Sequence, residues 1–349
     1  MHYTELSLTK YIEIFRNKSS NKMKHHQTPA IPPRIAVIGE LNADLIASGL
    51  AFPPRLGREV LAEDFRTVLG SASAIFACGA ARLQHPVTFF SQIGDDELGR
   101  FCLETLRTEG ISTEHVRTVP RARTGVTISL STRSDRALVT MLGLISRLRY
   151  ADLDLQALRG HSHLHLTSYF LQTALQPSFP RLLRRARKMG LTTSFDPNSD
   201  PSAFWGGGIW GAIAETTILF VNKEEALLLT RKRSIQAALE QLAKEAPCVV
   251  IKLGRDGAVA ASGKERAKAP GFEVSAVDTT GAGDSFAAGF VHAYVSGRDL
   301  HQCLVEGNAC GALSTLQVGG TAGQPRLAQL SRFLARKRNH LRMRRSSRR

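Results

Sequence analysis

A carboxylate placed directly after a run of small residues is the part of this sequence with the clearest chemistry. The segment from Val277 to Phe290 reads VDTTGAGDSFAAGF, and its glycines allow a tight turn that presents consecutive main-chain N–H groups at the start of an apolar helix. Such a helix start favours an anion such as phosphate. A carboxylate such as Asp284 is electrostatically unfavourable beside an anion site, so its presence indicates a chemical role. Taking a proton from a hydroxyl that attacks phosphorus would be such a role. The segment therefore indicates phosphoryl transfer.

Other glycine-rich motifs explain the segment less well. A dinucleotide-binding fingerprint would require its third glycine where Phe286 stands, and a P-loop would require a Gly-Lys-Ser/Thr sequence that does not follow. A purely structural glycine turn is the remaining alternative, but the segment is longer than such a turn requires.

The segment resembles the C-terminal signature of the ribokinase-like (PfkB) carbohydrate kinases, whose members phosphorylate sugars and nucleosides. The resemblance implies that Asp284 is the catalytic base and that the amides of Gly281, Ala282 and Gly283 form an anion hole. It implies ATP and Mg²⁺ as cofactors. It also implies a K⁺ ion beside the anion hole, with oxygen ligands from Asp278 and Thr280.

Two segments near the N-terminus resemble the sugar-binding parts of the same family. Gly39-Glu40-Leu41-Asn42-Ala43-Asp44 follows an apolar run and matches a segment whose aspartate holds sugar hydroxyls, so Asp44 is expected to bind a diol that Asn42 helps to orient. Gly70 and Ser71 are expected to present amides and a hydroxyl to the sugar. The family usually has a second glycine and a sugar-binding asparagine where Ser71 and Ile75 stand, so a specificity for ribose is not implied.

A third segment, Asp196-Pro197-Asn198 followed by Trp205, resembles that of fructokinase-like and 2-keto-3-deoxygluconate kinase-like members, and Asp196 and Asn198 are expected to contact substrate. Those members usually carry an arginine soon after the asparagine. Asp200 and Pro201 stand there instead, which argues against an acidic or phosphorylated substrate.

The nucleotide and its metal are expected at three further places. Asn222-Lys223-Glu224-Glu225 has the form of a capped helix start, and it also matches the family motif in which Asn222 and Glu225 serve Mg²⁺ and its waters. Lys252, Gly254 and Gly257 lie in a segment that resembles the family's nucleotide-edge loop. Asn308 resembles the family asparagine near adenine.

Three alternating histidines, His161, His163 and His165, project to one face of an expected strand, as metal ligands do. No cysteine or glutamate completes a ligand set with them, so packing or substrate contact is the favoured interpretation.

The elements that must position these residues alternate between apolar strands and helices, beginning with a strand at residues 35–39. This pattern predicts a mostly parallel central sheet with helices on both faces, and the resemblance implies that it is a ribokinase-like three-layer α/β/α sandwich. Period-2 stretches without helices predict a small separate β-sheet. The resemblance implies that this sheet is a lid over the sugar, from about residues 45–69 and 126–141. The other expected strands are Val87–Gln92, Leu164–Ser168, Thr192–Asp196, Ile218–Asn222 and Cys248–Lys252, and the expected helices are Ala72–Leu83, Glu97–Glu109, Phe179–Met189, Ile235–Glu245, Ser285–Tyr294 and Leu304–Leu316.

Charge is concentrated at the two ends of the chain. The 349 residues carry a net charge of +16, of which residues 331–349 contribute nine and residues 1–34 four, so residues 35–330 keep a net charge of +3. We therefore expect a basic N-terminal extension (1–34), one kinase domain (35–330) and a basic, solvated C-terminal tail (331–349) that binds polyanions non-specifically. Aromatic residues do not interleave with the charges, which argues against specific nucleic-acid binding.

The five cysteines show no C-x-x-C spacing and are expected to be reduced and mostly buried. No apolar stretch approaches the length of a membrane span, and no signal-peptide core is present near the N-terminus, so a cytoplasmic location is expected.

The sequence thus predicts an ATP-dependent kinase that phosphorylates a primary hydroxyl of a small carbohydrate resembling fructose, ribose or 2-keto-3-deoxygluconate. The alternatives are a nucleoside kinase of the same family, or a sugar-sensing or polyanion-binding protein with weak catalysis, which the intact Asp284 segment disfavours. An open lid sheet also predicts a homodimer formed through the lid.

Overall fold

The computed structural model describes residues 32–51, 54–132, 136–206 and 208–346. Nearly all of the basic N-terminal extension, and residues 133–135 within the second predicted lid segment, lie outside these ranges.

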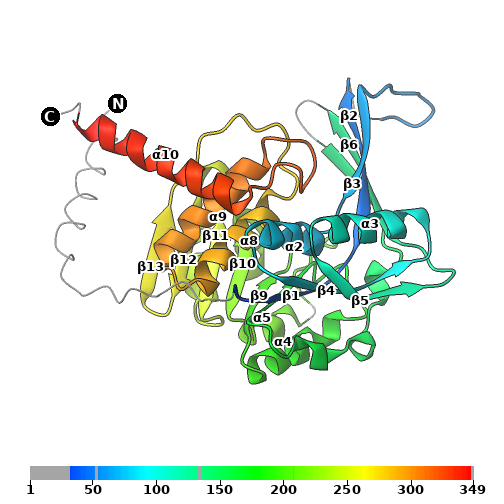
Figure 1. The fold of residues 1–349 in the computed structure, drawn as a ribbon, viewed down its shortest axis with the longest axis horizontal. Helices are drawn as coiled ribbons and strands as arrows, with labels where there is room; N and C mark the ends of the chain where they lie inside the picture. The colour runs from blue at the N-terminus through cyan, green and yellow to red at the C-terminus, as the bar shows by residue number, and fades with distance from the viewer. Residues whose placement is uncertain (1–31, 52–53, 133–135, 207, 347–349) are drawn as a thin grey trace. The chain divides into compact units, whose positions relative to one another are not determined.

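A nine-stranded sheet forms the centre of the structure, in the order β13-β12-β11-β10-β9-β8-β1-β4-β5 (Figure 1). The strands from β11 to β5 in this order are parallel, and β12 and β13 add an antiparallel edge. The strands are β1 (Ile35–Ile38), β4 (Val87–Gly94), β5 (Ser112–Val119), β8 (His163–Thr167), β9 (Thr192–Asp196), β10 (Ile218–Asn222), β11 (Cys248–Lys252), β12 (Ala258–Ser262) and β13 (Glu265–Ala269).

Helices cover both faces of this sheet. One face packs against α2 (Ala72–Arg82), α3 (Glu97–Thr108), α8 (Ala282–Val295) and α9 (Leu300–Ser314). The other face packs against α4 (Phe179–Lys188), α5 (Ile209–Ala214), α6 (Lys223–Thr230) and α7 (Ile235–Leu242). A final helix, α10 (Leu327–Ser346), follows them. The expected three-layer α/β/α sandwich is confirmed.

A separate four-stranded sheet forms the lid, in the order β3-β2-β6-β7. Its strands are β2 (Asn42–Leu50), β3 (Asp64–Leu69), β6 (Gly125–Thr132) and β7 (Arg136–Met141). Figure 1 shows this sheet standing away from the central sheet. The lid therefore forms from the two predicted segments, with β2 beginning slightly earlier than expected.

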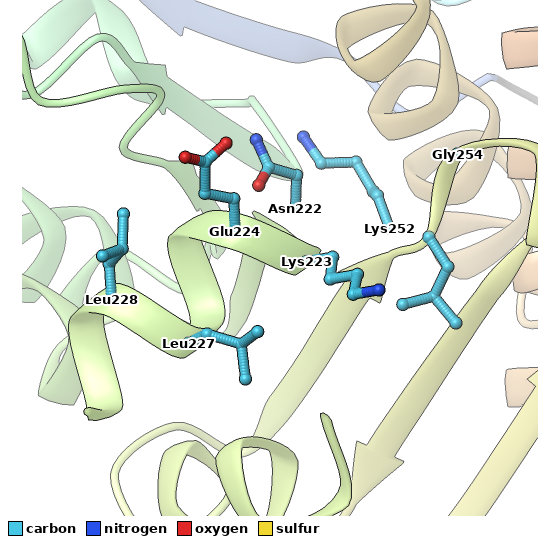
Figure 2. A pocket seen from close by; sticks show the side chains of 8 residues that line it. Asn222, Lys223, Glu224, Leu227, Leu228, Lys252 and Gly254 are labelled. Carbon is cyan, nitrogen blue, oxygen red and sulfur yellow. The ribbon is translucent and has the colours of Figure 1, made fainter. Parts of the chain in front are cut away.

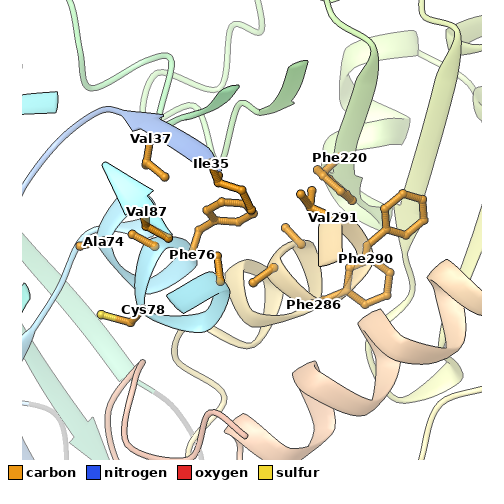
Figure 3. Packing of buried hydrophobic residues seen from close by; sticks show 14 of the residues in the cluster. Ile35, Val37, Ala74, Phe76, Cys78, Val87, Phe220, Phe286, Phe290 and Val291 are labelled. Atoms are coloured by element: carbon orange, nitrogen blue, oxygen red, sulfur yellow. The ribbon is translucent and has the colours of Figure 1, made fainter. Parts of the chain in front are cut away.

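Aromatic and aliphatic side chains pack α8 against the central sheet. Phe286 and Phe290 of α8 pack against Phe220 of β10, with the Phe290 and Phe220 rings edge to face at 5.3 Å. Figure 3 shows these rings together with Phe76 of α2 and Ile35 of β1 in one continuous core. Because the interior is closely packed, the start of α8 is held firmly at the edge of the sheet.

The expected character of the cysteines is confirmed. Each is buried and free, and burial raises the pKa of Cys78, Cys102 and Cys248 to about 12. None of the helices in the described ranges combines the length and apolarity that crossing a membrane requires.

The expectation of a frayed tail from residue 331 is wrong for its first part. The tail continues α10, and Leu330 is buried in a cluster with Leu83, Ala309 and Cys310. Phe333 and Leu334 pack partly buried against this cluster, and the Phe333 ring meets Phe272 edge-on at 5.0 Å. Apolar residues spaced three and four apart thus attach the helix, although its composition is basic.

Deleting residues 331–349 is therefore expected to lower the free energy of unfolding by about 2–4 kcal/mol, because it removes the packed Phe333 and Leu334 side chains. Urea unfolding of the full chain and two truncated chains measures the effect. Truncation after Lys337 is the matched control, since it removes most of the basic residues and keeps both apolar ones. Equal midpoints for the two truncations would show that residues 331–337 do not support the fold.

Candidate active site

The predicted site residues meet at the carboxyl ends of the parallel strands. Asp196 ends β9, in register with Thr167 at the end of β8. Asn222 ends β10, in register with Lys252 at the end of β11. Open α/β sheets bind ligands at this edge, where the helices that follow the strands begin.

The anion-hole turn fits only small residues. Gly281 adopts a left-handed conformation with φ 68° and precedes Ala282, the first residue of α8. A Cβ at Gly281 would lie 2.9 Å from the Cα of Gly320 and 2.9 Å from the Cγ2 atom of Ile75, and a Cβ at Gly283 would lie 3.1 Å from the Lys252 Nζ atom. Close neighbours thus leave no room for a side chain at these two positions, and Ile75 packs beneath the turn. The binding of an anion by the amides of residues 281–283 stays a prediction.

Asp284 lies in the first turn of α8, which begins at Ala282, three residues before the predicted start at Ser285. Its side chain is buried. Burial, and then the charge of Asp196, raise the pKa of Asp284 to about 8, while Lys252 lowers it and Glu40 and Glu225 raise it further. A buried carboxyl group with a raised pKa is a stronger proton acceptor than an ordinary aspartate.

Lys252 supplies positive charge within this group of carboxylates. Its Nζ atom donates to the Asp196 Oδ2 atom at 2.5 Å. Burial alone would lower the pKa of Lys252, but Asp196, Glu225 and Asp284 together raise it, so the side chain is a cation. Figure 2 shows the Lys252 ammonium group beside the Asn222 amide at the neighbouring strand ends. These residues line a hollow of about 490 Å³ with Gly254 and Leu253.

Asn222 and Glu225 form a reciprocal helix cap. The Asn222 side chain accepts a hydrogen bond from the Glu225 main-chain N–H at 2.9 Å, and the Glu225 carboxylate accepts one from the Asn222 N–H at 2.7 Å. Burial, and then the charge of Asp196, raise the pKa of Glu225 to about 7. The capped-helix interpretation is confirmed, and the buried carboxylate oxygens remain a donor set that suits a hard cation.

The expected sugar-binding residues lie together where the lid joins the central sheet. The Asn42 amide donates to the Asp44 Oδ1 atom at 2.9 Å, and a Cβ at Gly70 would lie 2.1 Å from that same oxygen. Burial raises the pKa of Asp44 to about 6, while the Asn42 hydrogen bond and Arg136 lower it and Asp278 raises it. A small residue at position 70 is therefore required for Asp44 to occupy this place.

The side chains of Ser71 and Asn198 form hydrogen bonds within the protein that stabilise the local structure. The Ser71 hydroxyl caps α2 by accepting from the Ala74 N–H at 3.1 Å, and it donates to the Glu40 carbonyl at 2.5 Å. The Asn198 side chain accepts from the Ser168 N–H at 3.0 Å. Both residues lie beside the site, and their contact with a substrate stays a prediction.

The residues predicted at the nucleotide edge lie close together, but they differ in how much space surrounds them. Gly254 has a positive φ and open space where a Cβ would be, whereas a Cβ at Gly257 would lie 2.1 Å from the Ala269 carbonyl oxygen. The Asn308 amide donates to the Ala269 and Pro270 carbonyls, both at 3.1 Å. Asn308 thus anchors the segment that follows β13, and its position near adenine stays a prediction.

Asp278 and Thr280, the predicted K⁺ ligands, are already bonded to protein groups. Asp278 accepts from the Thr280 N–H at 2.9 Å, from the Thr280 hydroxyl at 2.7 Å and from the Gly319 N–H at 2.8 Å. An arginine of the lid, Arg136, donates to the Thr280 Oγ1 atom at 2.6 Å. These contacts hold the turn together, and the binding of K⁺ by Asp278 and Thr280 stays a prediction.

The three histidines are hydrogen-bonded to neighbouring hydroxyl groups and are not arranged as metal ligands. His163 bonds Thr192 and Ser194, His165 bonds Ser194, and His161 bonds Thr88. Within the described residues no group of three or more ligand-type side chains is placed to hold a metal ion. The packing interpretation of the histidines is supported.

Glu40 is a site residue that sequence reasoning did not single out. It is buried at the end of β1 and accepts hydrogen bonds from the hydroxyls of Ser73 at 2.7 Å, Thr167 at 3.1 Å and Ser168 at 2.8 Å. In the sequence, only its position between Gly39 and Asn42 could have indicated that Glu40 belongs to the site. The network ties β1, α2 and the end of β8 together beneath the site.

Comparison with known proteins agrees with this geometry. A sequence profile of the pfkB family carbohydrate kinases matches residues 32–327. The chain is 30% identical over 308 residues to the ATP-dependent ribose-1-phosphate kinase of Halopiger xanaduensis, which covers 86% of this chain and 98% of that protein. It is 30% identical over 293 residues to the 2-dehydro-3-deoxygluconokinase of Bacillus subtilis, with coverages of 78% and 89%.

A solved structure of a putative ribokinase II from E. coli in complex with ATP and Mg²⁺ superposes with a TM-score of 0.79 at 24% identity, covering 87% of this chain and 99% of that one. The fold and the site thus define a sugar kinase of the ribokinase type. The chain belongs to the pfkB family of carbohydrate kinases, as the Asp284 segment predicted.

Proposed function

We propose that this kinase transfers the γ-phosphoryl group of ATP to a primary hydroxyl of a small carbohydrate, with Asp284 as the general base. The observation that carries the proposal is the burial of Asp284 in the first turn of α8, directly after the glycine turn and near Lys252. The base accepts the hydroxyl proton as the oxygen attacks phosphorus, while the amides of residues 281–283 stabilise the charge on the transferring group.

Mg²⁺ fits the carboxylate-rich side of the site. Asn222 and Glu225, through water, would hold it, and the ion would neutralise charge on the ATP phosphates. Burial and Asp196 raise the pKa of Glu225 more than Lys252 lowers it, so a further cation beside this carboxylate would be favourable. Lys252 contributes a second, fixed positive charge on the same side.

The acceptor is proposed to lie between Asp44 and Asp284. Relatives are named for ribose 1-phosphate, 2-dehydro-3-deoxygluconate and fructose, so the acceptor panel should contain phosphorylated, acidic and neutral sugars, with nucleosides as the alternative class. ADP formation with each acceptor, checked by mass of the product, tests the function. Formation of no phosphorylated product from any acceptor would contradict it.

Replacing Asp44 with asparagine is expected to raise the KM for the accepted sugar by about tenfold or more and to leave the KM for ATP within about twofold. The carboxylate accepts hydrogen bonds from sugar hydroxyls in the ground state and the transition state alike, so its loss acts mainly on binding. Steady-state kinetics with each substrate varied in turn measure the effect. An equal rise in both KM values would remove Asp44 from the acceptor site.

Three further properties belong to the proposal. One face of the lid exposes Phe65 (60%), Ile128 (38%), Val139 (58%) and Met141 (43%), which supports a homodimer formed through the lid. The basic end of the chain is proposed to bind polyanions non-specifically. The protein is proposed to act in the cytoplasm.

A further inference from the structure

A single arginine connects the lid to the turn that precedes the anion hole. Arg136, the first residue of β7, donates from its Nη1 atom to the Thr280 Oγ1 atom at 2.6 Å, and the same nitrogen lies 3.5 Å from the Asp278 Oδ1 atom. More than 140 residues separate the two partners in the sequence. Charge-assisted hydrogen bonds of this length are among the stronger side-chain contacts.

The strand register places Arg136 on the same face of the lid as Asp44. Asp44 is opposite Thr127 on β6, and Arg136 is opposite Ser131 on β6. Because side chains alternate along a strand, Thr127 and Ser131 share one face, and their partners share it with them. The face that carries the acceptor carboxylate therefore also carries the guanidinium group. Both Arg136 and Asp278 influence the pKa of Asp44, in opposite directions, which supports their closeness.

The turn that Arg136 contacts is also tied to the body of the protein. Asp278 holds the Thr280 N–H and hydroxyl, and it receives the Gly319 N–H from the opposite loop. The N–H groups of Val277 and Asp278 both donate to the Thr315 carbonyl. Gly281, the residue after Thr280, has the left-handed conformation that opens the anion hole. A displacement of Thr280 is thus passed directly to the main chain of the hole.

We propose that Arg136 is a positioning residue for phosphoryl transfer: its hydrogen bond to Thr280 couples the position of the lid to the shape of the anion hole. This inference rests on the proposed function of the Asp284 site. When the lid covers the acceptor, Arg136 holds Thr280 and with it Gly281 in the conformation that receives the transferring phosphoryl group. When the lid opens, the turn loses this contact, so ATP is less well placed for attack by water.

Kinetics of Arg136→Ala, with Arg136→Lys and Arg66→Ala beside it, test the coupling. Arg66 is the matched control, because it lies on the same face of the lid but pairs with Asp64 two residues away within β3. For Arg136→Ala we expect kcat to fall about tenfold or more, since a small misplacement of reacting groups is costly, with the KM for ATP within twofold. Arg136→Lys should recover part of kcat, and Arg66→Ala should match the wild type.

Removing Arg136 should also leave the rate of ATP hydrolysis without sugar no higher than in the wild type, because the turn without this contact places ATP poorly for attack by water. The melting temperature should be unchanged, because the contact is partly exposed. An Arg136→Ala enzyme with the kinetics of Arg66→Ala would overturn the proposal. A rise in the sugar KM alone, with kcat unchanged, would also overturn it, because Arg136 would then bind the acceptor rather than position the hole.

Amide hydrogen exchange of the full-length protein without ligands gives a readout that does not depend on activity. The peptide containing residues 278–281 should exchange faster in Arg136→Ala than in Arg66→Ala and the wild type, and equal exchange would contradict the coupling. If the wild type phosphorylates no acceptor, the proposed function fails while this comparison still decides whether Arg136 holds the turn.

Discussion

Replacing Asp284 with asparagine is expected to lower kcat by about 10²–10⁴-fold, the usual contribution of a positioned general base. The amide keeps the size and shape of the side chain in the first turn of α8, but it does not accept the proton of the attacking hydroxyl. ATP affinity should change little, because the anion-hole amides and Lys252 remain in place. Single-turnover measurements with saturating ATP and sugar isolate this step.

The same substitution is expected to stabilise the fold at neutral and alkaline pH. The ordinary pKa of Asp284 is 3.8, and the folded value is about 8. Between these pH values the unfolded chain releases a proton that the folded protein keeps, so the wild type loses stability as the pH rises, and the loss is complete above about pH 8. The asparagine variant lacks this loss. Its melting temperature should exceed that of the wild type by about 2 °C or more at pH 8, with a smaller difference at pH 5.

Asp299→Asn is a suitable control for both measurements. Asp299 caps α9 by accepting from the Gln302 N–H at 2.7 Å, and asparagine caps a helix equally well. Turnover of Asp284→Asn within about threefold of this control would remove Asp284 from the role of base. If the difference in melting temperature between Asp284→Asn and this control does not change with pH, the raised pKa of Asp284 is contradicted.

The central sheet was predictable because its strands are buried on both faces. Thr192–Asp196, Ile218–Asn222 and Cys248–Lys252 were predicted with the residue limits that the structure has. Parallel strands covered by helices appear in the sequence as short, nearly continuous apolar runs that end in polar or charged residues. Those terminal residues, Asp196, Asn222 and Lys252, are also predicted site residues, but it was the resemblance to the family, and not the strand pattern, that identified them.

Contacts between distant segments were not predictable in the same way. Glu40 is satisfied by hydroxyls of Ser73, Thr167 and Ser168, which lie between 33 and 128 residues away, and no local pattern marks them as partners. Arg136 looks like an ordinary lid residue until the fold brings Thr280 to it. Phe333 and Leu334 could have packed as a last helical turn, but the basic composition of the tail favoured a solvated end, and the structure shows that these two residues do pack.

The positive charge of Lys252 is expected to be nearly as important for transfer as the base. Lys252→Met replaces the ammonium group with an apolar chain of similar length and leaves Asp196 unpaired near Asp284 and Glu225. We expect kcat to fall by about 10²–10³-fold, the loss typical for removing one group that stabilises transition-state charge. Because Lys252 lowers the pKa of Asp284, the acidic limb of the pH profile of kcat should also move to higher pH in the variant.

Loss of turnover in this variant has to be separated from loss of folding, because an unpaired buried Asp196 costs about 3–5 kcal/mol of stability. The double variant Asp196→Asn/Lys252→Met removes both charges, so it should regain most of the stability while its kcat stays low. Lys252→Arg keeps a cation at the strand end and should retain more activity than the methionine variant. If the double variant recovers activity together with stability, Lys252 serves only to neutralise Asp196, and its charge does not act on the phosphoryl group.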